Sequence, residues 1–534
     1  MKSECLPFPQ IPHTTRLFAD FLSHPEKLQQ FYPRSPFFTE WFKDEASAIR
    51  YDAARRQRIS AVLERQNRSW QASAKTVANI ARLRDGAAAV VTGQQVGLFG
   101  GPMFSLYKAL TAVKLAELAT QSGVDCVPVF WLATEDHDLA EVDHLSLPAP
   151  DGSLRRLVAT TPARPDAPVG TITFGPEIDE LVGTAADLLG SSEIAGTLRE
   201  CYRPGENYGS AFARLFARLF ADWGVILLDA SDPEIHHISQ PVYRAAVERS
   251  AELDEALLKR GRALEAAGYH QQVKVTPSSA LLFALQNGAR ISVHRRESEF
   301  LIHEEKISQA ELLERVTSAP QNFSANVLLR PVVQDYLLPT LAYTGGAAEV
   351  AYFAQAAVVY EAILGRVTPV IPRFSATIVE SKPASLLERY GLNFVDVFRG
   401  PEGLRELLAA RTLSAELQSA FAGAENSLKQ SLDKIRAALD RLDKTLVDAS
   451  DNAASKMQHQ LESLRAKAAR AELRQTEILT RHAELLSQTL YPNKSLQERE
   501  LPAIYFLSRH GADLLRSLYD SIHTDCLDHQ VITL

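Results

Sequence analysis

Four ionisable side chains stand together after an apolar stretch early in the chain, and their types suit acid–base chemistry. They are Glu135, Asp136, His137 and Asp138. Histidine has an unperturbed pKa near neutrality, so His137 is the natural candidate for a base, and the acids could bind an ammonium group or accept a proton from an amine. A solvated loop without chemistry is the alternative. No metal site is expected on Asp136 and His137, because adjacent side chains of a strand point apart.

A glycine-rich turn precedes this cluster and is suited to holding an anion. Glycines let the backbone approach a ligand, and the free N–H groups of a helix that begins at Pro102 would favour a negative group. The turn matches neither Gly-x-Gly-x-x-Gly nor a Walker A loop, so an anion site and a plain turn stay equal alternatives. Lys108, in the helix, could neutralise the anion or be solvated. The residues concerned are Thr92, Gly93, Gln94, Gln95, Gly97, Gly100 and Gly101.

The elements around these residues predict a strand–helix–strand unit of a parallel sheet. The runs 87–92 and 127–133 are short, continuous and apolar, as strands buried on both faces are. The run 224–229 resembles another such strand, with Asp229 at its end as a functional residue or a helix cap. The run 370–375 resembles a late core strand ending in a basic, hydroxyl-bearing turn with Arg373 and Ser375. Alternation in 280–285 and 289–293 predicts an inserted antiparallel hairpin.

A second set of polar residues surrounds the apolar stretch that ends at Tyr343. A glycine pair between an apolar segment and a helix can form a backbone anion site, and an arginine can pair bidentately with a carboxylate. A buried Arg330–Asp335 ion pair that only ties the fold together is an equal alternative. The set comprises Asn326, Arg330, Gln334, Asp335, Tyr343, Gly345, Gly346 and Glu349.

Length and composition exclude several classes of protein. A chain of 534 residues predicts two or three domains, and its net charge of −8 argues against a general nucleic-acid or membrane-surface role. No apolar run is expected to span a membrane. The scattered cysteines Cys5, Cys126, Cys201 and Cys526 predict neither a zinc site nor a disulfide framework, so a reduced cytoplasm is the expected compartment.

The pattern changes to a long helix after about residue 403. An apolar seam with heptad spacing indicates a coiled coil, formed by Leu428, Leu432, Ile435, Leu439, Leu442 and Leu446. A turn at 448–452 would make a helical hairpin, and one long bent helix is the alternative. Because so short a coiled coil is marginal alone, a partner helix and a homodimer are expected. We therefore predict a core over 1–400 with insertions at 147–220 and 270–320, an arm over 401–492, and a segment, 493–534, that returns to the core.

Three blocks of residues resemble the bacillithiol biosynthesis cysteine-adding enzyme family, BshC. The first block is 92–95, 100–102, 107–110 and 130–138; the second is 329–331 with 334–343; the third is 496–499 with 504–507. The blocks follow the family's order along nearly the whole chain. One departure concerns the loop that the family usually writes Gly-Gly-Pro-Gly-Glu. Here Ala347 and Ala348 replace its Pro-Gly, which could change the turn.

This resemblance implies an α/β enzyme that adds cysteine to the amine of glucosaminyl malate and forms bacillithiol. It implies a Rossmann-like sheet similar to class I nucleotidyltransferases and a helical arm that dimerises. A free carboxylate is a poor acyl donor, so an adenylate or acyl-phosphate made with ATP or another nucleotide is inferred. The glycine turn, Lys108, Arg373 and Ser375 would hold the nucleotide, and Arg330 the malate carboxylates. A nucleotide-binding regulator or scaffold, and an adenylate-forming ligase for another small acid, are the alternatives.

Overall fold

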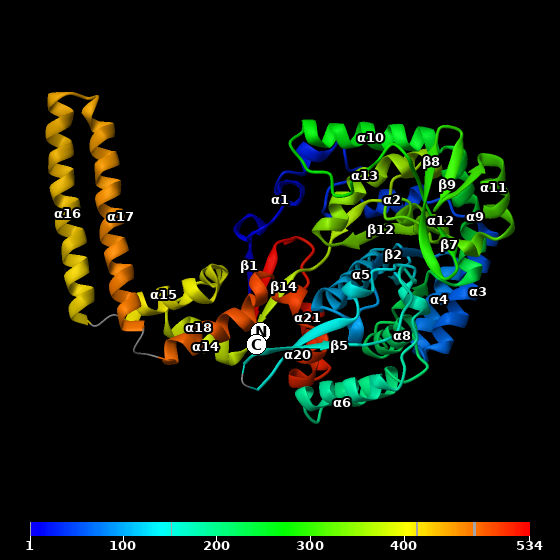
Figure 1. Ribbon diagram of the computed structural model, residues 1–534, viewed down its shortest axis with the longest axis horizontal. Helices are drawn as coiled ribbons and strands as arrows, with labels where there is room; N and C mark the ends of the chain where they lie inside the picture. Colours follow the sequence, from blue (N-terminus) through cyan, green and yellow to red (C-terminus); the bar gives the residue numbers. More distant parts are fainter. Residues whose placement is uncertain (1, 151, 413–414, 474–476) are drawn as a thin grey trace. The chain divides into compact units, whose positions relative to one another are not determined.

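The computed structural model describes residues 2–150, 152–412, 415–473 and 477–534, and these form two compact units (Figure 1). The larger unit comprises Ser3–Ala376 and Glu498–Gln530, and the smaller comprises Thr377–Gln497 and Val531–Leu534. The division after Ala376 lies before the boundary at 400 that the sequence suggested. The reason is that α14 (Ser381–Arg389) and α15 (Gly400–Thr412) both pack on α18 (Glu477–Leu490), which belongs to the smaller unit.

A five-stranded parallel sheet forms the centre of the larger unit. Its strand order is β13-β12-β2-β3-β6, and each neighbouring pair is parallel. Nearly every residue of these strands is buried, as the continuous apolar runs predict. The Rossmann-like parallel core expected from the sequence is therefore confirmed. The strands are β2 (Ala88–Gln94), β3 (Cys126–Leu132), β6 (Ile226–Asp229), β12 (Thr340–Gly345) and β13 (Val370–Pro372).

The strand order reverses beside β2. The chain passes from β2 to β3 and β6 in one direction, whereas β12 and β13 lie on the other side. Connections that leave in opposite directions open a crevice at the carboxyl ends of the strands, and open parallel sheets bind ligands there. The Thr92 hydroxyl donates to the Thr344 carbonyl at 2.8 Å and joins β2 to β12 at this point. The expected binding crevice is therefore at the ends of these two strands.

Helices surround the sheet within the larger unit. The long helix α5 (Met103–Gln121) connects β2 to β3, and Pro102 is its N-cap. Asn67 of α3 donates to and accepts from the backbone of Leu227, at 2.8 and 3.1 Å, and so covers the free edge of β6. The other helices are α1 (Arg16–Ser23), α2 (Phe42–Ala48), α3 (Ala53–Ser69), α4 (Ala74–Asp85), α6 (Glu177–Leu189), α7 (Glu193–Cys201), α8 (Tyr208–Leu219), α9 (Pro233–Glu248), α10 (Ser250–Ala266), α12 (Arg330–Leu337), α20 (Ala503–His510) and α21 (Asp513–Asp520).

An antiparallel sheet of order β10-β9-β8-β7-β11 lies within the same unit. Its strands β7 (Ser279–Gln286) and β8 (Ala289–Arg296) form the hairpin that alternation predicted, which is confirmed. Asn287 and Gly288 make the turn with φ of 53° and 77°, the left-handed values that a tight hairpin needs. The remaining elements are β9 (Glu299–Ile302), β10 (Glu305–Ser308), α11 (Gln309–Ser318) and β11 (Phe323–Ala325), and the separate hairpin of β4 (His144–Pro148) and β5 (Leu154–Val158).

Helix α13 (Ala347–Leu364) differs from the expectation that no apolar run could span a membrane. By length and composition it is long and apolar enough to do so. However, 56% of it is buried inside the protein, and it packs on α10, β12 and β13. Apolar runs in the sequence do not predict this helix as a candidate span, because Glu349 and Glu361 interrupt its apolar residues. Its burial in the core accounts for its apolar composition.

The smaller unit carries a helical hairpin of α16 (Ala415–Leu442) and α17 (Leu446–Leu473), here called the arm (Figure 1). The hairpin prediction is confirmed, and the single bent helix is excluded. The turn lies at 443–445, not at 448–452 as predicted. Asp443 accepts hydrogen bonds from the Thr445 amide and hydroxyl, both at 2.8 Å, and these local bonds end the first helix. Arg436 and Asp451 pair across the hairpin at 2.8 Å.

The cysteines also differ from the prediction, because Cys5 and Cys526 form a disulfide. The strands β1 (Lys2–Leu6) and β15 (His529–Thr533) are neighbours in a three-stranded sheet of order β1-β15-β14, where β14 is Ala376–Val379. This pairing brings the two cysteines together from opposite ends of the chain, and cysteine spacing cannot show it. Cys126 and Cys201 are free and buried. The cysteine argument for a reduced compartment therefore does not hold.

Candidate active site

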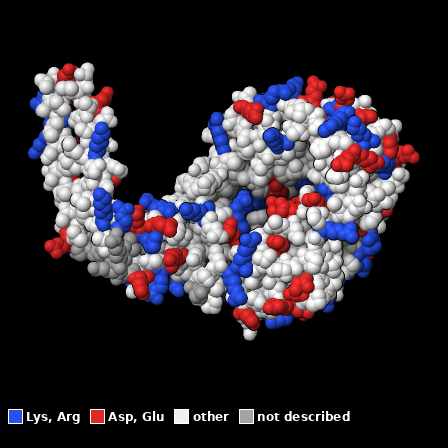
Figure 2. Space-filling model, viewed as in Figure 1, with Lys and Arg blue, Asp and Glu red and all other residues white. Residues whose placement is uncertain are grey.

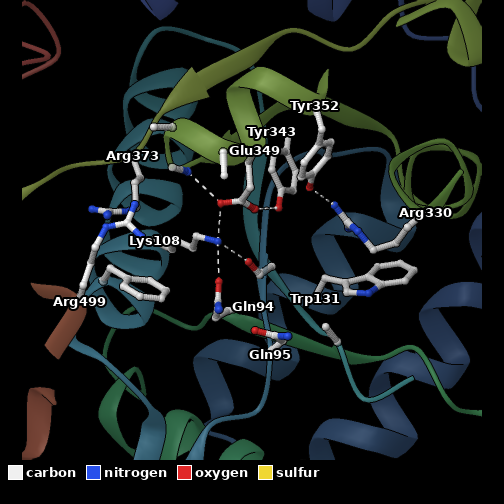
Figure 3. A pocket seen from close by; sticks show the side chains of 16 residues that line it. Gln94, Gln95, Lys108, Trp131, Arg330, Tyr343, Glu349, Tyr352, Arg373 and Arg499 are labelled. Atoms are coloured by element: carbon white, nitrogen blue, oxygen red, sulfur yellow. Dashed lines mark hydrogen bonds and ion pairs between the residues drawn. The ribbon is translucent and has the colours of Figure 1, made fainter. Parts of the chain in front are cut away.

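A cavity of about 280 Å³ lies at the carboxyl ends of β2 and β12, where the strand order reverses. Figure 2 shows basic and acidic side chains in the hollow of this face, and Figure 3 shows the cavity from close by. Aromatic rings of Trp131, Tyr343 and Tyr352 line the part of it around Arg330, and the ring of Phe104 lies beside Arg373. Its polar lining consists of Gln94, Gln95, Lys108, Arg330, Glu349, Arg373 and Arg499.

Lys108 and Glu349 form a buried ion pair at the centre of the cavity wall. The Lys108 ammonium lies 2.5 Å from Glu349, 2.8 Å from the Gly93 carbonyl and 2.7 Å from the Gln94 amide oxygen. These contacts engage all three of its N–H groups. Burial lowers the pKa of Lys108 to about 8, although Glu349 opposes this. Lys108 is therefore not solvated but holds the end of β2 in place, and its role toward an anion stays a prediction.

Glu349 is held from the other side by the start of α13. Its carboxylate accepts the Gly346 N–H at 2.8 Å and the Tyr343 hydroxyl. Burial alone would raise the pKa of Glu349, but Lys108 and these hydrogen bonds lower it. A Cβ on Gly345 would lie 2.7 Å from that of Glu349, so only glycine fits there. The carboxylate thus closes the turn in which Ala347 and Ala348 replace the family's usual residues.

Arg330 lies on the aromatic side of the cavity and has only neutral partners. It donates to the Tyr352 hydroxyl at 2.9 Å and to the Gln334 amide oxygen at 3.1 Å. Its guanidinium also lies over the rings of Trp131 and Tyr343, 5.9 and 5.5 Å from their centroids. The guanidinium stays charged. Glu349 attracts that charge without forming a direct ion pair with it among the described residues. The side chain of Arg330 therefore lies in the cavity with hydrogen-bond partners that are all neutral.

The alternative Arg330–Asp335 ion pair does not form among the described residues. Asp335 instead accepts the Gln334 amide at 3.0 Å, and burial raises the pKa of its carboxyl. Both Gln334 and Asp335 are buried and neither lines the cavity. Of the second set of residues, Arg330, Tyr343, Gly346 and Glu349 meet at the cavity.

Arg373 lines the cavity but is already paired with Glu498. Two nitrogens of its guanidinium donate to the two carboxylate oxygens at 2.6 and 3.0 Å. Ser375 donates to the same carboxylate at 3.0 Å and contacts His529 at 2.7 Å, away from the cavity. Arg373 and Ser375 are thus held by bonds within the protein, and the nucleotide contacts expected from them stay a prediction.

Arg499 is the cavity residue that sequence reasoning missed, together with Trp131 and Tyr352. It follows Glu498 in the short helix α19 (Gln497–Glu500). The block 496–499 was noticed as part of the family resemblance. However, nothing in its spacing relates it to β2 or β12, which only the tertiary fold brings near.

The glycine-rich turn beyond Gln95 is buried and lines no part of this cavity. Gly100 has φ +92°, and a Cβ there would lie 3.2 Å from Leu215 of α8. A Cβ on Gly97 would lie 2.9 Å from the Cα of Gly101. The first amide of α5, that of Met103, donates to the Leu501 carbonyl at 2.9 Å. These glycines therefore have a packing role, and the anion contacts expected from them stay a prediction.

Replacing Gly100 by valine is accordingly expected to damage folding. A left-handed backbone and a tight contact with Leu215 should together lower the free energy of unfolding by about 2–5 kcal/mol. Gly183→Val is the matched control, because Gly183 has open space around it and no positive φ. Urea denaturation of both variants tests this. Equal midpoints for Gly100→Val and the wild type would contradict the packing role.

The acidic cluster follows β3 and lies next to the cavity through Gln95. The Gln95 amide donates to Asp136 at 2.7 Å, and Gln95 itself lines the cavity. His137 lies 3.3 Å from a guanidinium nitrogen of Arg290, whereas Asp138 is exposed. Glu135 turns inward to His236, 3.4 Å away, and burial raises its pKa to about 8 against the opposing charge of Arg290. Asp136 and His137 thus lie at the rim of the cavity, whereas Glu135 points into the interior of the protein.

The remaining acid at a strand end, Asp229, joins the interior part. It accepts hydrogen bonds from the Thr134 hydroxyl at 2.5 Å and from Ser231. Burial raises the pKa of Asp229, and Asp232, not Asp229, caps α9. Among residues 2–150, 152–412, 415–473 and 477–534, no group of three or more His, Cys, Asp or Glu is arranged to hold a metal ion.

The protein is an α/β protein of the Rossmann-like class. It has a cationic cavity where its strand order reverses, and it carries a coiled-coil unit. Comparison with known families then identifies it: the chain belongs to the bacillithiol biosynthesis BshC family. Residues 1–374 match the family's N-terminal Rossmann-like domain, and residues 376–534 match its C-terminal coiled-coil domain. The second match begins at the division seen in the structure.

Individual relatives are similar over their whole length. A protein of Koribacter versatilis named "Putative cysteine ligase BshC" is 50% identical, and its namesake in Solibacter usitatus is 40% identical, each over 100% of both chains. The namesake in Geobacillus thermodenitrificans is 30% identical over 95% of this chain and 96% of its own. Among solved structures, Mycobacterium tuberculosis methionyl-tRNA synthetase in complex with methionyl-adenylate aligns over 76% of this chain and 92% of its own. Its TM-score of 0.23 and 12% identity are too low to carry an argument.

Proposed function

We propose that the protein is a cysteine ligase that joins the carboxylate of cysteine to the amine of glucosaminyl malate, giving bacillithiol. Full-length relatives named as cysteine ligases support the reaction. The observation that carries the proposal is the charge of the cavity. Arg330 and Arg499 line it without a carboxylate partner among the described residues, at the point of the sheet where ligands bind.

The reaction requires that the cysteine carboxylate be activated, because an oxide ion is a poor leaving group. In the proposed route a carboxylate oxygen attacks ATP or another nucleoside triphosphate. Attack at the α-phosphorus gives an adenylate and releases pyrophosphate, whereas attack at the γ-phosphorus gives an acyl-phosphate and releases the nucleoside diphosphate. The amine nitrogen then attacks the carbonyl carbon, and AMP or phosphate leaves. The cationic lining suits such anions, because guanidinium groups bind phosphates and carboxylates through paired hydrogen bonds.

The residues of the cavity and its rim can be assigned roles on this basis. Arg330 would bind a malate carboxylate of the acceptor, with Trp131 and Tyr352 keeping its side chain in place. His137 or Asp136 at the rim would accept the proton that the amine loses as the amide forms. Glu135, which contacts His236 on the inner side of the cluster, would be a further acceptor for that proton. Asp138, being exposed, would bind an ammonium group at the entrance.

Incubation of the purified protein with L-cysteine, ATP and glucosaminyl malate tests the proposal. Mass spectrometry should detect bacillithiol, and release of AMP or of ADP distinguishes an adenylate from an acyl-phosphate. An acceptor whose amine is acetylated is the matched control and should give no product. In a deletion strain, thiol profiling should show lost bacillithiol and accumulated glucosaminyl malate. Unchanged bacillithiol in that strain would refute the assignment. The reaction is proposed for the cytoplasm.

We also propose that the arm forms a homodimer. Ile435 is 51% exposed, Leu442 77% and Leu464 57%, so the hairpin leaves part of its apolar seam uncovered. Two long helices that expose such a seam are expected to pair with a second copy, because pairing removes apolar surface from water.

The double variant Ile435→Lys, Leu464→Lys is expected to convert a dimer into monomers. Charges on these exposed positions should oppose pairing without disturbing the packing between α16 and α17. Light scattering at micromolar concentration measures the change, and Lys434→Gln, on the same helix, is the control. A wild-type protein that is already monomeric would refute the proposed dimer.

A further inference from the structure

Glu498 and Arg499 are neighbours in α19 with different surroundings. The Glu498 side chain is held by several hydrogen bonds, whereas the Arg499 side chain is not. Glu498 is 1% exposed and accepts hydrogen bonds from the Arg373 guanidinium, the Ser375 hydroxyl and, at 3.1 Å, the Ala376 amide. So many bonds to one carboxylate fix the backbone of α19 at this residue. The side chain of the next residue, Arg499, is thereby directed into the cavity (Figure 3).

Arg499 has no hydrogen bond or ion pair within the described part of the chain. Burial and the neighbouring Arg373 charge lower the pKa of Arg499, and the carboxylates of Glu498, Glu349 and Glu500 only partly oppose this. Glu498 forms its ion pair with Arg373, so the Arg499 guanidinium has no ion-pair partner of its own among the described residues. A bound anion would reduce the repulsion between the Arg373 and Arg499 guanidinium groups.

The other cations of the cavity cannot take the place of Arg499. Lys108 has all its N–H groups engaged, and Arg373 is paired with Glu498. Arg330 lies on the opposite side of the cavity, among Trp131, Tyr343 and Tyr352 (Figure 3). Arg499 is therefore the cation available to a ligand on the Arg373 side of the cavity.

The surroundings of Arg499 suit a phosphate group better than a carboxylate. Arg373 adds a second guanidinium nearby, and Ala347 and Ala348, at the start of the eighteen-residue helix α13, line the cavity with small side chains. A phosphoanhydride carries more charge than a carboxylate and gains more from several positive groups. The aromatic side around Arg330, with a single guanidinium, suits the smaller charge of a carboxylate.

We propose that Arg499 binds a phosphate group of the activating nucleotide, and that the cavity divides into a phosphate side at Arg499 and a carboxylate side at Arg330. This inference rests on the proposed ligase function. It assigns to the block 496–499 a direct role in binding, which neither the family match nor the names of the relatives give. The phosphate chemistry is that of a nucleoside triphosphate or of the pyrophosphate it releases.

Calorimetric titration of the full-length protein with ATP, pyrophosphate and L-malate tests the division. Arg499→Met keeps the length of the side chain and removes its charge, and it should weaken ATP and pyrophosphate binding by about tenfold to a hundredfold. Malate binding should change less than about twofold. Arg499→Lys should restore part of the ATP affinity. Arg84→Met is the control, since Arg84 is exposed on α4 and pairs only with Asp85.

The outcomes of this titration distinguish a wrong role for Arg499 from a wrong ligase function. If the wild type binds ATP and Arg499→Met binds it equally well, the assignment of Arg499 is wrong and the ligase proposal stands. If Arg499→Met loses malate and keeps ATP, the two sides of the cavity are reversed. If the wild type binds neither ATP nor pyrophosphate, both nucleotide activation and the phosphate side are refuted. Thermal melts of the variants confirm that affinity, not folding, has changed.

Discussion

Glu498→Ala is expected to lower the free energy of unfolding by about 3–5 kcal/mol, the cost of breaking a buried ion pair by removing one partner. The Arg373 guanidinium would then stay buried without its carboxylate, and Ser375 and the Ala376 amide would lose their acceptor. A typical domain has only about 5–15 kcal/mol of stability in total. A large fraction of the stability of the larger unit therefore depends on this carboxylate.

Urea denaturation measures the loss, and Glu64→Ala is the matched control. Glu64 pairs with Arg68 on the surface, where an ion pair contributes about 0–1 kcal/mol. Burial alone would raise the pKa of Glu498, but Arg373 outweighs it and holds that pKa below the ordinary value of 4.5. The contribution of Glu498 is therefore present above about pH 4.5 and is lost as the pH falls further. Equal denaturation midpoints for Glu498→Ala and Glu64→Ala would show that the pair contributes little.

Local patterns in the sequence predict the elements of the larger unit well. The apolar runs of β2 and β3, the helix between them and the Asn287-Gly288 hairpin all depend on residues close together in the chain, where periodicity and turn chemistry act. The arm was predicted as a hairpin from its heptads. Its turn was misplaced because the Asp443–Thr445 bonds that end α16 leave the heptad pattern unbroken up to Leu446.

The candidate site was predicted less completely, because its contacts join distant segments. Lys108 and Glu349 were each identified, but their pairing depends on the neighbouring positions of β2 and β12 in the sheet. Arg499 and the Cys5–Cys526 disulfide depend on how the end of the chain returns to the larger unit. The glycines 97, 100 and 101 show a further limit. A glycine needed for close packing and one needed for a ligand have the same signature in a sequence.

Arg330→Met is expected to reduce ligase activity by between about 30-fold and several thousand-fold. Removing one partner of a buried charge pair costs about 2–5 kcal/mol, and each 1.4 kcal/mol is a factor of about ten. If Arg330 binds the malate carboxylate, the loss should appear as a higher KM for glucosaminyl malate, with the KM values of cysteine and ATP nearly unchanged.

Tyr352→Phe provides a milder test of the same role of Arg330. It removes the hydroxyl that accepts from Arg330 at 2.9 Å and leaves the guanidinium in the cavity. Its KM for glucosaminyl malate should rise by about two- to tenfold, which is the range for one lost hydrogen bond. Steady-state kinetics with each substrate varied in turn separates the possibilities. A rise in the KM of cysteine alone would mean that Arg330 binds the amino-acid carboxylate, and the acceptor would then have to lie elsewhere in the cavity.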